Sequence, residues 1–191
     1  MATVNLVPNA DVSNSPAWTL SGGSDVYPLI AAEASAAEFS DSDKISATAA
    51  GKKCIVEFQS LADVGVATSN VFNSVQAEVH ATIYERAQTY TIGVRILDSS
   101  NTELWAQETS AGSSGGNWAT HTFTARTTDG IDAWNDTDID GIRMEIEGVA
   151  MSDYTLRVGY AKFIIDYTIP LIPKSLTING VATINGQLTI K

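Results

Sequence analysis

Apolar and polar residues alternate along several stretches of the chain. In residues 75–83 every second position is apolar, and the same alternation recurs in 90–96, 142–146 and 156–160. Because successive side chains of a β-strand point to opposite faces, each stretch predicts a strand with one buried and one solvent-exposed face. Gly, Ser, Asn and Asp gather between these stretches, as turns require. The pattern predicts an all-β protein, an antiparallel jelly-roll β-sandwich with a short C-terminal β-hairpin or meander tail.

The C-terminal part has a pattern of its own. The sequence Thr-Ile-Asn-Gly at 177–180 recurs at 183–186, and Thr189 begins a third copy. Asn-Gly readily takes the positive φ angles of a two-residue hairpin turn, so the repeat predicts a small meander. A six-residue period is also that of a β-helix rung, although fewer than three full repeats cannot bury a solenoid core. Pro170 and Pro173 favour an extended connection before the repeat.

These patterns divide the chain into a β-sandwich at 1–168, a proline-containing linker at 169–175 and a tail at 176–191. A sheet as small as the tail is only marginally stable by itself, so its apolar face must pack against another surface. The surface could be the protein's own sandwich, another copy of this chain in a dimer or trimer, or a different subunit. Because two prolines separate the tail from the sandwich, we expect another chain to supply it. The residues that would mediate oligomerisation or attachment are the apolar ones of the tail: Leu176, Ile178, Val181, Ile184, Leu188 and Ile190.

Composition excludes several classes of protein. The 22 acidic residues outnumber the 11 basic ones, and a net charge of −11 disfavours nucleic acid as a partner. One cysteine and two histidines do not provide a disulfide framework or a zinc module. The sequence has no apolar run of membrane-spanning length and no secretory signal at its N-terminus, so we expect synthesis in a host cytoplasm and no membrane partner.

Three short segments share features with a known family. Residues 5–12 read Asn-Leu-Val-Pro-Asn-Ala-Asp-Val and precede Trp18, residues 118–125 read Trp-Ala-Thr-His-Thr-Phe-Thr-Ala, and residues 159–166 end in Ile-Ile-Asp. In this order they resemble the carbohydrate-binding modules of the galactose-binding-like jelly-roll kind. The resemblance implies a sandwich that binds glycans. Ala10 and Val12 depart from the Gly and Phe of the family's opening motif, so sugar binding does not follow automatically.

The tail resembles a second group of proteins. Its Leu-Thr-Ile-Asn-Gly repeats are similar to attachment and trimerisation segments of tailed-bacteriophage virion proteins. This resemblance implies a non-enzymatic virion protein, first of all a capsid decoration, cement or head-fibre protein that binds the major capsid protein or another virion protein. The alternative is a carbohydrate-binding module or receptor-binding adhesin, and a third interpretation is a hydrolase.

A glycan site on such a sandwich needs exposed aromatic rings, because sugars pack their C–H faces on them, and polar side chains that fix the hydroxyls. Tyr84 falls on the polar face of its predicted strand, Trp105 stands among polar residues, and Trp134 lies in an acidic loop. These three are the predicted rings. The predicted polar partners are Gln76, Glu78 and Arg86.

An acidic loop provides a candidate calcium site. Asp136, Asp138 and Asp140 stand on alternate positions before a glycine, and Glu147 follows in the spacing of a calcium-binding loop. The alternative is a solvated acidic turn, and the fold itself requires no cofactor. Catalysis has little support, because the sequence has no nucleophile elbow, no phosphate loop and no His-Glu-Xaa-Xaa-His motif. Both histidines, His80 and His121, are expected on the surface.

Overall fold

The computed structural model describes residues 1–15, 17–31, 44–83, 88–113, 118–151 and 155–170. Tyr84 and Arg86, two of the predicted glycan-binding residues, lie outside these ranges. The six apolar tail residues predicted to mediate attachment lie outside them as well. Their roles therefore stay predictions.

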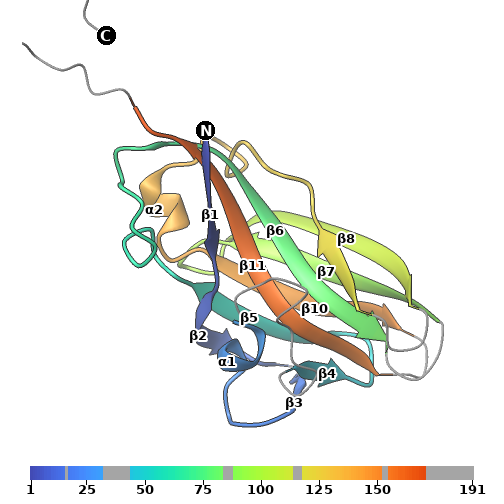
Figure 1. Cartoon of the computed structure of the whole chain (residues 1–191). Helices are drawn as coiled ribbons and strands as arrows, with labels where there is room; N and C mark the ends of the chain where they lie inside the picture. The colour runs from blue at the N-terminus through green and yellow to red at the C-terminus, as the bar shows by residue number, and fades with distance from the viewer. Residues whose placement is uncertain (16, 32–43, 84–87, 114–117, 152–154, 171–191) are drawn as a thin grey trace, which may run out of the picture.

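Two antiparallel sheets face each other and form a jelly-roll β-sandwich, as the alternation predicted (Figure 1). Sheet A has the order β3-β4-β11-β6-β9, with β1 also paired to β11, and sheet B has the order β2-β5-β10-β7-β8. The strands of sheet A are β1 (Ala2–Leu6), β3 (Thr19–Leu20), β4 (Ile45–Ala47), β6 (Val71–Ile83), β9 (Ala119–Thr122) and β11 (Leu156–Thr168). Those of sheet B are β2 (Pro8–Ser13), β5 (Lys52–Phe58), β7 (Gln88–Leu97), β8 (Glu103–Ser113) and β10 (Arg143–Met151). Two four-residue helices, α1 (Tyr27–Ile30) and α2 (Asp136–Ile139), lie in the connections.

The core lies between the sheets and is made by the apolar positions of the alternating segments. On β6, Val75, Ala77 and Val79 are fully buried, and on β10 Met144 and Ile146 are fully buried from the other side. Burial of this kind is the main force that holds two sheets face to face, at about 25 cal/mol for each Å² of apolar surface removed from water. The sequence prediction of the inner face is confirmed for both strands.

The prediction that the outer face of β6 is exposed to solvent is wrong for the second half of the strand. Glu78, His80 and Thr82 point away from the core, yet they are only 9%, 4% and 0% exposed. The reason is the position of the strand: β6 is an inner strand of sheet A, and the outward side chains of its neighbours pack against its own. A two-residue period predicts which face a side chain occupies but not whether that face meets water.

Candidate binding face on sheet A

Three rings stand in a row on the outer face of sheet A. His80 of β6 lies between Tyr160 of β11 and Trp118, which precedes β9. The His80 and Tyr160 ring centroids are 4.9 Å apart with planes 1° from parallel, and those of His80 and Trp118 are 5.4 Å apart with planes at 8°. Neighbouring strands of a sheet lie about 4.8 Å apart, which is close to these centroid separations. The rings therefore stand side by side, one on β11, one on β6 and one just before β9. We call these three residues the ring row.

A β-bulge in β11 places the tyrosine in this row. Val158 pairs with Ala81 and Tyr160 pairs with His80, so Gly159 is the extra residue without a partner on β6. The alternation of Leu156, Val158 and Tyr160 had placed all three side chains on one face. Because the bulge adds one residue, Tyr160 turns to the outer face.

Polar side chains border the ring row along β6 and β11. The Lys162 ammonium forms an ion pair with Glu78 at 2.8 Å, and both side chains are nearly buried, 10% and 12% exposed. The Tyr160 hydroxyl donates to Glu78 Oε1 at 3.0 Å, and the Thr122 hydroxyl donates to Glu78 Oε2 at 3.3 Å. Lys162 Nζ also lies 5.7 Å from the centroid of the Tyr160 ring. Glu78, one of the polar residues predicted to contact a glycan, is therefore the centre of this polar cluster.

Burial sets the protonation state of the histidine. It lowers the pKa of His80 below the ordinary 6.5, the positive charge of a protonated His121 lowers it further, and Glu78 opposes the shift. His80 is therefore neutral at physiological pH. Its Nδ1 lies 3.0 Å from the hydroxyl oxygen of Thr120. Burial also raises the pKa of the Tyr160 hydroxyl, which stays protonated and able to donate.

The second histidine, His121, lies inside the sandwich rather than on the surface. It pairs with the inward-facing Val79, is 7% exposed, and its Nε2 lies 2.5 Å from the Tyr90 hydroxyl. Tyr90 also donates to the Ala81 carbonyl at 3.2 Å. The expectation of two surface histidines is wrong because residue type alone does not reveal a buried partner.

Two of the predicted glycan-binding rings are not on this face. Trp134 is 4% exposed, and its indole Nε1 donates to the Arg126 carbonyl at 2.7 Å, so the expected exposed ring is a core residue. Trp105 belongs to β8 of sheet B, pairs with Ile96 and packs edge-on against Phe123. The predicted platform is therefore not assembled from these two rings.

Two of the predicted polar partners, Gln76 and Glu78, lie on β6 in the same sheet as the ring row. The side-chain amide of Gln76 donates to the Phe123 carbonyl at 2.9 Å, while Glu78 belongs to the cluster described above. Sequence reasoning missed Trp118, Tyr160 and Lys162 as site residues. All three lie in segments that resemble carbohydrate-binding modules, but the outward direction of Tyr160 and Lys162 depends on the bulge, which the sequence pattern did not indicate.

The predicted calcium ligands make other interactions. Asp136, Asp138 and Asp140 lie in or next to α2, where Asn135 and Asp138 form a capping box. Asp140 Oδ1 accepts from the backbone N–H of Leu61 at 2.8 Å. In the described part of the chain, no group of three or more His, Cys, Asp or Glu side chains is arranged to hold a metal ion. The four predicted ligands are thus not gathered in this arrangement, and calcium could bind only if the acidic loop rearranged.

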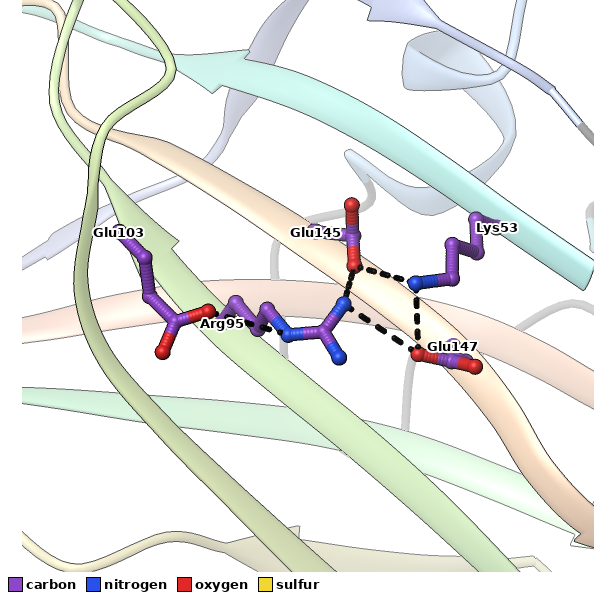
Figure 2. A network of polar contacts seen from close by, with 5 residues as sticks. All are labelled: Lys53, Arg95, Glu103, Glu145 and Glu147. Carbon is purple, nitrogen blue, oxygen red and sulfur yellow. Dashed lines mark hydrogen bonds and ion pairs between the residues drawn. The ribbon is translucent and has the colours of Figure 1, made fainter. Parts of the chain in front are cut away.

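Glu147, the fourth of these ligands, belongs to a charge network on the outer face of sheet B. Figure 2 shows Lys53 and Arg95 each placed between Glu145 and Glu147. Lys53 Nζ lies 3.2 Å and 3.0 Å from the two carboxylates, and Arg95 Nε lies 3.2 Å from Glu103. Burial alone lowers the pKa of Lys53, but its hydrogen bonds to Glu147 and Glu145 outweigh this effect and raise it. Its two cations compensate two of its three carboxylates.

No protein-family model and no curated protein matches the chain, but several solved structures are similar to it. The CBM36-1 domain of a multidomain xylanase from the hindgut metagenome of Trinervitermes trinervoides is similar in structure, with a TM-score of 0.42 and 6% identity over 86% of this chain and 97% of that domain. The C-terminal family 22 carbohydrate-binding module of Clostridium thermocellum Xyn10B gives a TM-score of 0.40 and 14% identity over 77% of this chain and 80% of the module.

A glycosidase is also similar over part of its length. An arabinose-bound GH51 α-L-arabinofuranosidase gives a TM-score of 0.42 and 12% identity over 81% of this chain. The chain spans only 22% of that enzyme. In the described residues, no helix is long and apolar enough to cross a membrane. We assign the fold class from the two sheets of this chain, and we infer a function from the residues on their outer faces.

Proposed function

We propose that the chain is a non-catalytic glycan-binding module and that it binds through the outer face of sheet A, at the edge formed by β9. The observation that carries the proposal is the ring row, which holds the half-buried Trp118 beside an ion pair and two exposed threonines, Thr120 and Thr122. Aromatic rings and hydrogen-bonding groups in one place are what a sugar surface needs, because its C–H faces are apolar and its rim is polar.

The three rings of the row differ in exposure, and we therefore propose different roles for them. Tyr160 and His80 are 3% and 4% exposed, so they support the neighbouring ring and do not themselves meet a large ligand. Trp118 is the most exposed ring of the three and lies next to the edge strand β9. A ring already held by packing loses little conformational freedom when a ligand binds, which favours affinity.

The polar groups of this edge give the proposed site its hydrogen-bonding capacity. Thr122 already donates to Glu78, so its hydroxyl oxygen retains lone pairs that can accept from a sugar hydroxyl. Thr120, an exposed residue two positions away on the same face, has its hydroxyl 3.0 Å from His80 Nδ1, and that hydroxyl oxygen keeps a further lone pair that can accept from a sugar. The charges of Glu78 and Lys162 compensate each other, which suits a neutral polysaccharide better than a strongly acidic one.

Affinity electrophoresis of the full chain in gels containing soluble xylan, mixed-linkage β-glucan or polygalacturonate tests the proposal. We expect retardation by at least one neutral polysaccharide and weaker retardation by polygalacturonate. Replacing Trp118→Ala is expected to weaken binding at least about tenfold, as loss of a central aromatic contact does. Thr122→Val should also weaken it. Trp105→Phe and Thr124→Val are matched controls away from the ring row and should bind as the unaltered chain does.

Two results would contradict this proposal. One is the absence of retardation by every polysaccharide in the panel. The other is retardation that is unchanged in a Trp118→Ala chain whose thermal unfolding shows that it is folded. Loss of binding in Trp105→Phe but not in Trp118→Ala would move the site to sheet B.

A role in a virion is the second candidate, and one observation favours attachment in general. The large exposed apolar side chains of the described residues lie at the end of the sandwich from which the C-terminal segment leaves. A bacteriophage decoration protein that uses residues 170–191 for docking should lose particle binding when these residues are removed. Particle binding that survives the truncation would contradict this candidate and leave glycan binding unaffected.

A further inference from the structure

The exposed apolar side chains are not scattered over the sandwich. Among the described residues, four large hydrophobic side chains are exposed: Met1 (96%), Ile131 (88%), Ile169 (65%) and Val71 (58%). Single exposed apolar residues are normal on a protein surface, but several in one place indicate an interface. Their positions in the sheets therefore decide what they mean.

Strand pairing brings three of the four to one end of sheet A. Val71, the first residue of β6, pairs with Thr168, and Ile169 is the next residue of that chain segment. Met1 directly precedes β1, whose first residue pairs with Tyr167 of β11. Figure 1 shows the N-terminus, the start of β6 and the end of β11 at the same end of the molecule.

The fourth residue, Ile131, belongs to a loop beside the same end. Its loop is closed by a bridge between Thr128 and Ala133, and it follows Arg126, which bridges to Val75 near the start of β6. In Figure 1 this gold segment lies close to the N-terminus. We name the surface made by Met1, Val71, Ile131 and Ile169 the apolar end.

The chain beyond the apolar end is itself rich in apolar residues. The segment 171–191 begins directly after Pro170 and contains the alternating pattern with its two Asn-Gly pairs. The tail, which the sequence predicts to need cover, therefore begins only a few residues after the apolar end.

We infer that the apolar end is an interface between copies of this chain. A second copy is the occupant that covers both surfaces at once, because it presents the same apolar end and the same tail in a closed symmetric arrangement. The net charge of −11 opposes assembly elsewhere on the surface, which directs contact to the part of the molecule where apolar residues are exposed. This inference concerns a different surface from the glycan site and does not depend on it.

Sedimentation velocity of the full chain over a range of concentrations tests the inference. We expect a dimer or trimer that dissociates on dilution. Its dissociation constant should fall as NaCl is raised from about 0.05 M to about 0.5 M, because salt screens the repulsion between acidic copies. The double substitution Val71→Ser and Ile131→Ser is expected to raise that constant at least about tenfold, since both residues would lose buried apolar contact.

A matched control uses apolar residues at the opposite end of the sandwich. Ala49 and Ala50 are exposed in the connection between β4 and β5, and the double substitution Ala49→Ser and Ala50→Ser should leave the dissociation constant unchanged. Amide hydrogen exchange in β1 and at the start of β6 should become slower as the protein concentration is raised from below to above the dissociation constant of the oligomer. Because Val71 and Ile131 are already exposed, their replacement should not unfold the sandwich.

Each other outcome contradicts the inference. A full chain that is monomeric at the highest concentration would show that the tail covers the apolar end of its own chain or leaves it bare. An oligomer that is equally stable with the Val71→Ser and Ile131→Ser substitutions would place the contact in the tail alone. An oligomer weakened only by Trp118→Ala would place it on the β9 edge of sheet A.

Discussion

Tyr160 stands opposite His80 across the β6–β11 pair, and the two rings are parallel to within 1°. The unpaired Gly159 creates this relationship, because it shifts the register by one residue and turns the tyrosine out of the core. The stack holds the histidine in a poorly hydrated position between two aromatic rings. The protonation of His80 is therefore coupled to the stability of the whole sheet.

Stability is expected to fall as the pH is lowered from neutral toward 5. Burial lowers the pKa of both His80 and His121 in the folded chain, whereas in the unfolded chain both titrate near 6.5. Below 6.5 the unfolded state therefore binds more protons than the folded state, which favours unfolding until the folded histidines also become protonated. Thermal unfolding at about pH 7.5 and about pH 5.5 should show a lower midpoint at the acidic value.

The variant His80→Gln provides the control for this pH effect. It removes one of the two titrating groups, so the difference between the two midpoints should become smaller even if the variant is less stable at neutral pH. A difference that is unchanged in His80→Gln, and also in His121→Gln, would mean that the acid sensitivity arises from other groups.

Asp98 affects stability in a separate, more acidic range of pH. Its carboxylate accepts hydrogen bonds from the backbone N–H groups of Thr102 and Ser100, which lower its pKa below the ordinary 3.8. This stabilisation is lost as the pH falls below 3.8 and the carboxylate becomes protonated.

Removing one partner of the Glu78–Lys162 ion pair is expected to destabilise the fold much more than removing Arg95 from the network on sheet B. Both side chains of the pair are nearly buried, so either Glu78→Gln or Lys162→Met leaves a charge in a poorly solvated place and should cost about 3 kcal/mol. Arg95 is 34% exposed, so Arg95→Met should cost less than about 1 kcal/mol. Urea denaturation of the three variants measures the difference.

A double-mutant cycle separates the pair from its surroundings. If the two charges compensate each other, the combined Glu78→Gln and Lys162→Met chain should be destabilised by clearly less than the sum of the single variants. Additive costs would indicate that each residue acts mainly through its other contacts, for example the hydrogen bond from the Tyr160 hydroxyl to Glu78.

The sequence predicts the core better than it predicts the outer faces, and the reason is physical. The apolar positions of 75–83 and 142–146 lie as predicted, because one face of each strand must be apolar to meet the opposite sheet. The bulge at Gly159 was not predictable in this way, since a register shift is a property of two paired strands and not of one. Trp134 was assigned to the surface because its neighbours are acidic, whereas its indole packs inward and bonds to Arg126.

The candidate site was only partly predictable for the same reason. Glu78 was selected by its place on the polar face of a strand, and it does occupy the centre of the polar cluster. Its ring partners, Trp118 and Tyr160, come from segments about 40 and 80 residues farther along the chain, and no local pattern links them to β6. Only the strand order of sheet A brings them to one face.

Gly93 is expected to be intolerant of even the smallest side chain. A Cβ at this position in β7 would lie 2.9 Å from Val149 Cγ2, closer than packed carbon atoms approach. Gly93→Ala should therefore cost about 1–3 kcal/mol through overpacking. Adding Val149→Ala removes the contacted methyl group and should restore part of the loss. Gly22→Ala is the control, because nothing lies within 4 Å of its added Cβ, and urea denaturation of all three chains gives the comparison.

Calcium is expected to leave the thermal midpoint unchanged, because three of the four candidate ligands already have partners. Asp138 is held in the capping box with Asn135, Asp140 accepts from the N–H of Leu61, and Glu147 is paired with the two cations of the sheet B network. A metal ion would have to break these interactions before it gained ligands. Differential scanning fluorimetry with about 5 mM calcium, about 5 mM magnesium or a chelator measures the effect, since a bound ion would stabilise the folded state. A rise in the midpoint with calcium but not magnesium, abolished by Asp140→Asn, would contradict this prediction and show that the acidic loop rearranges around the ion.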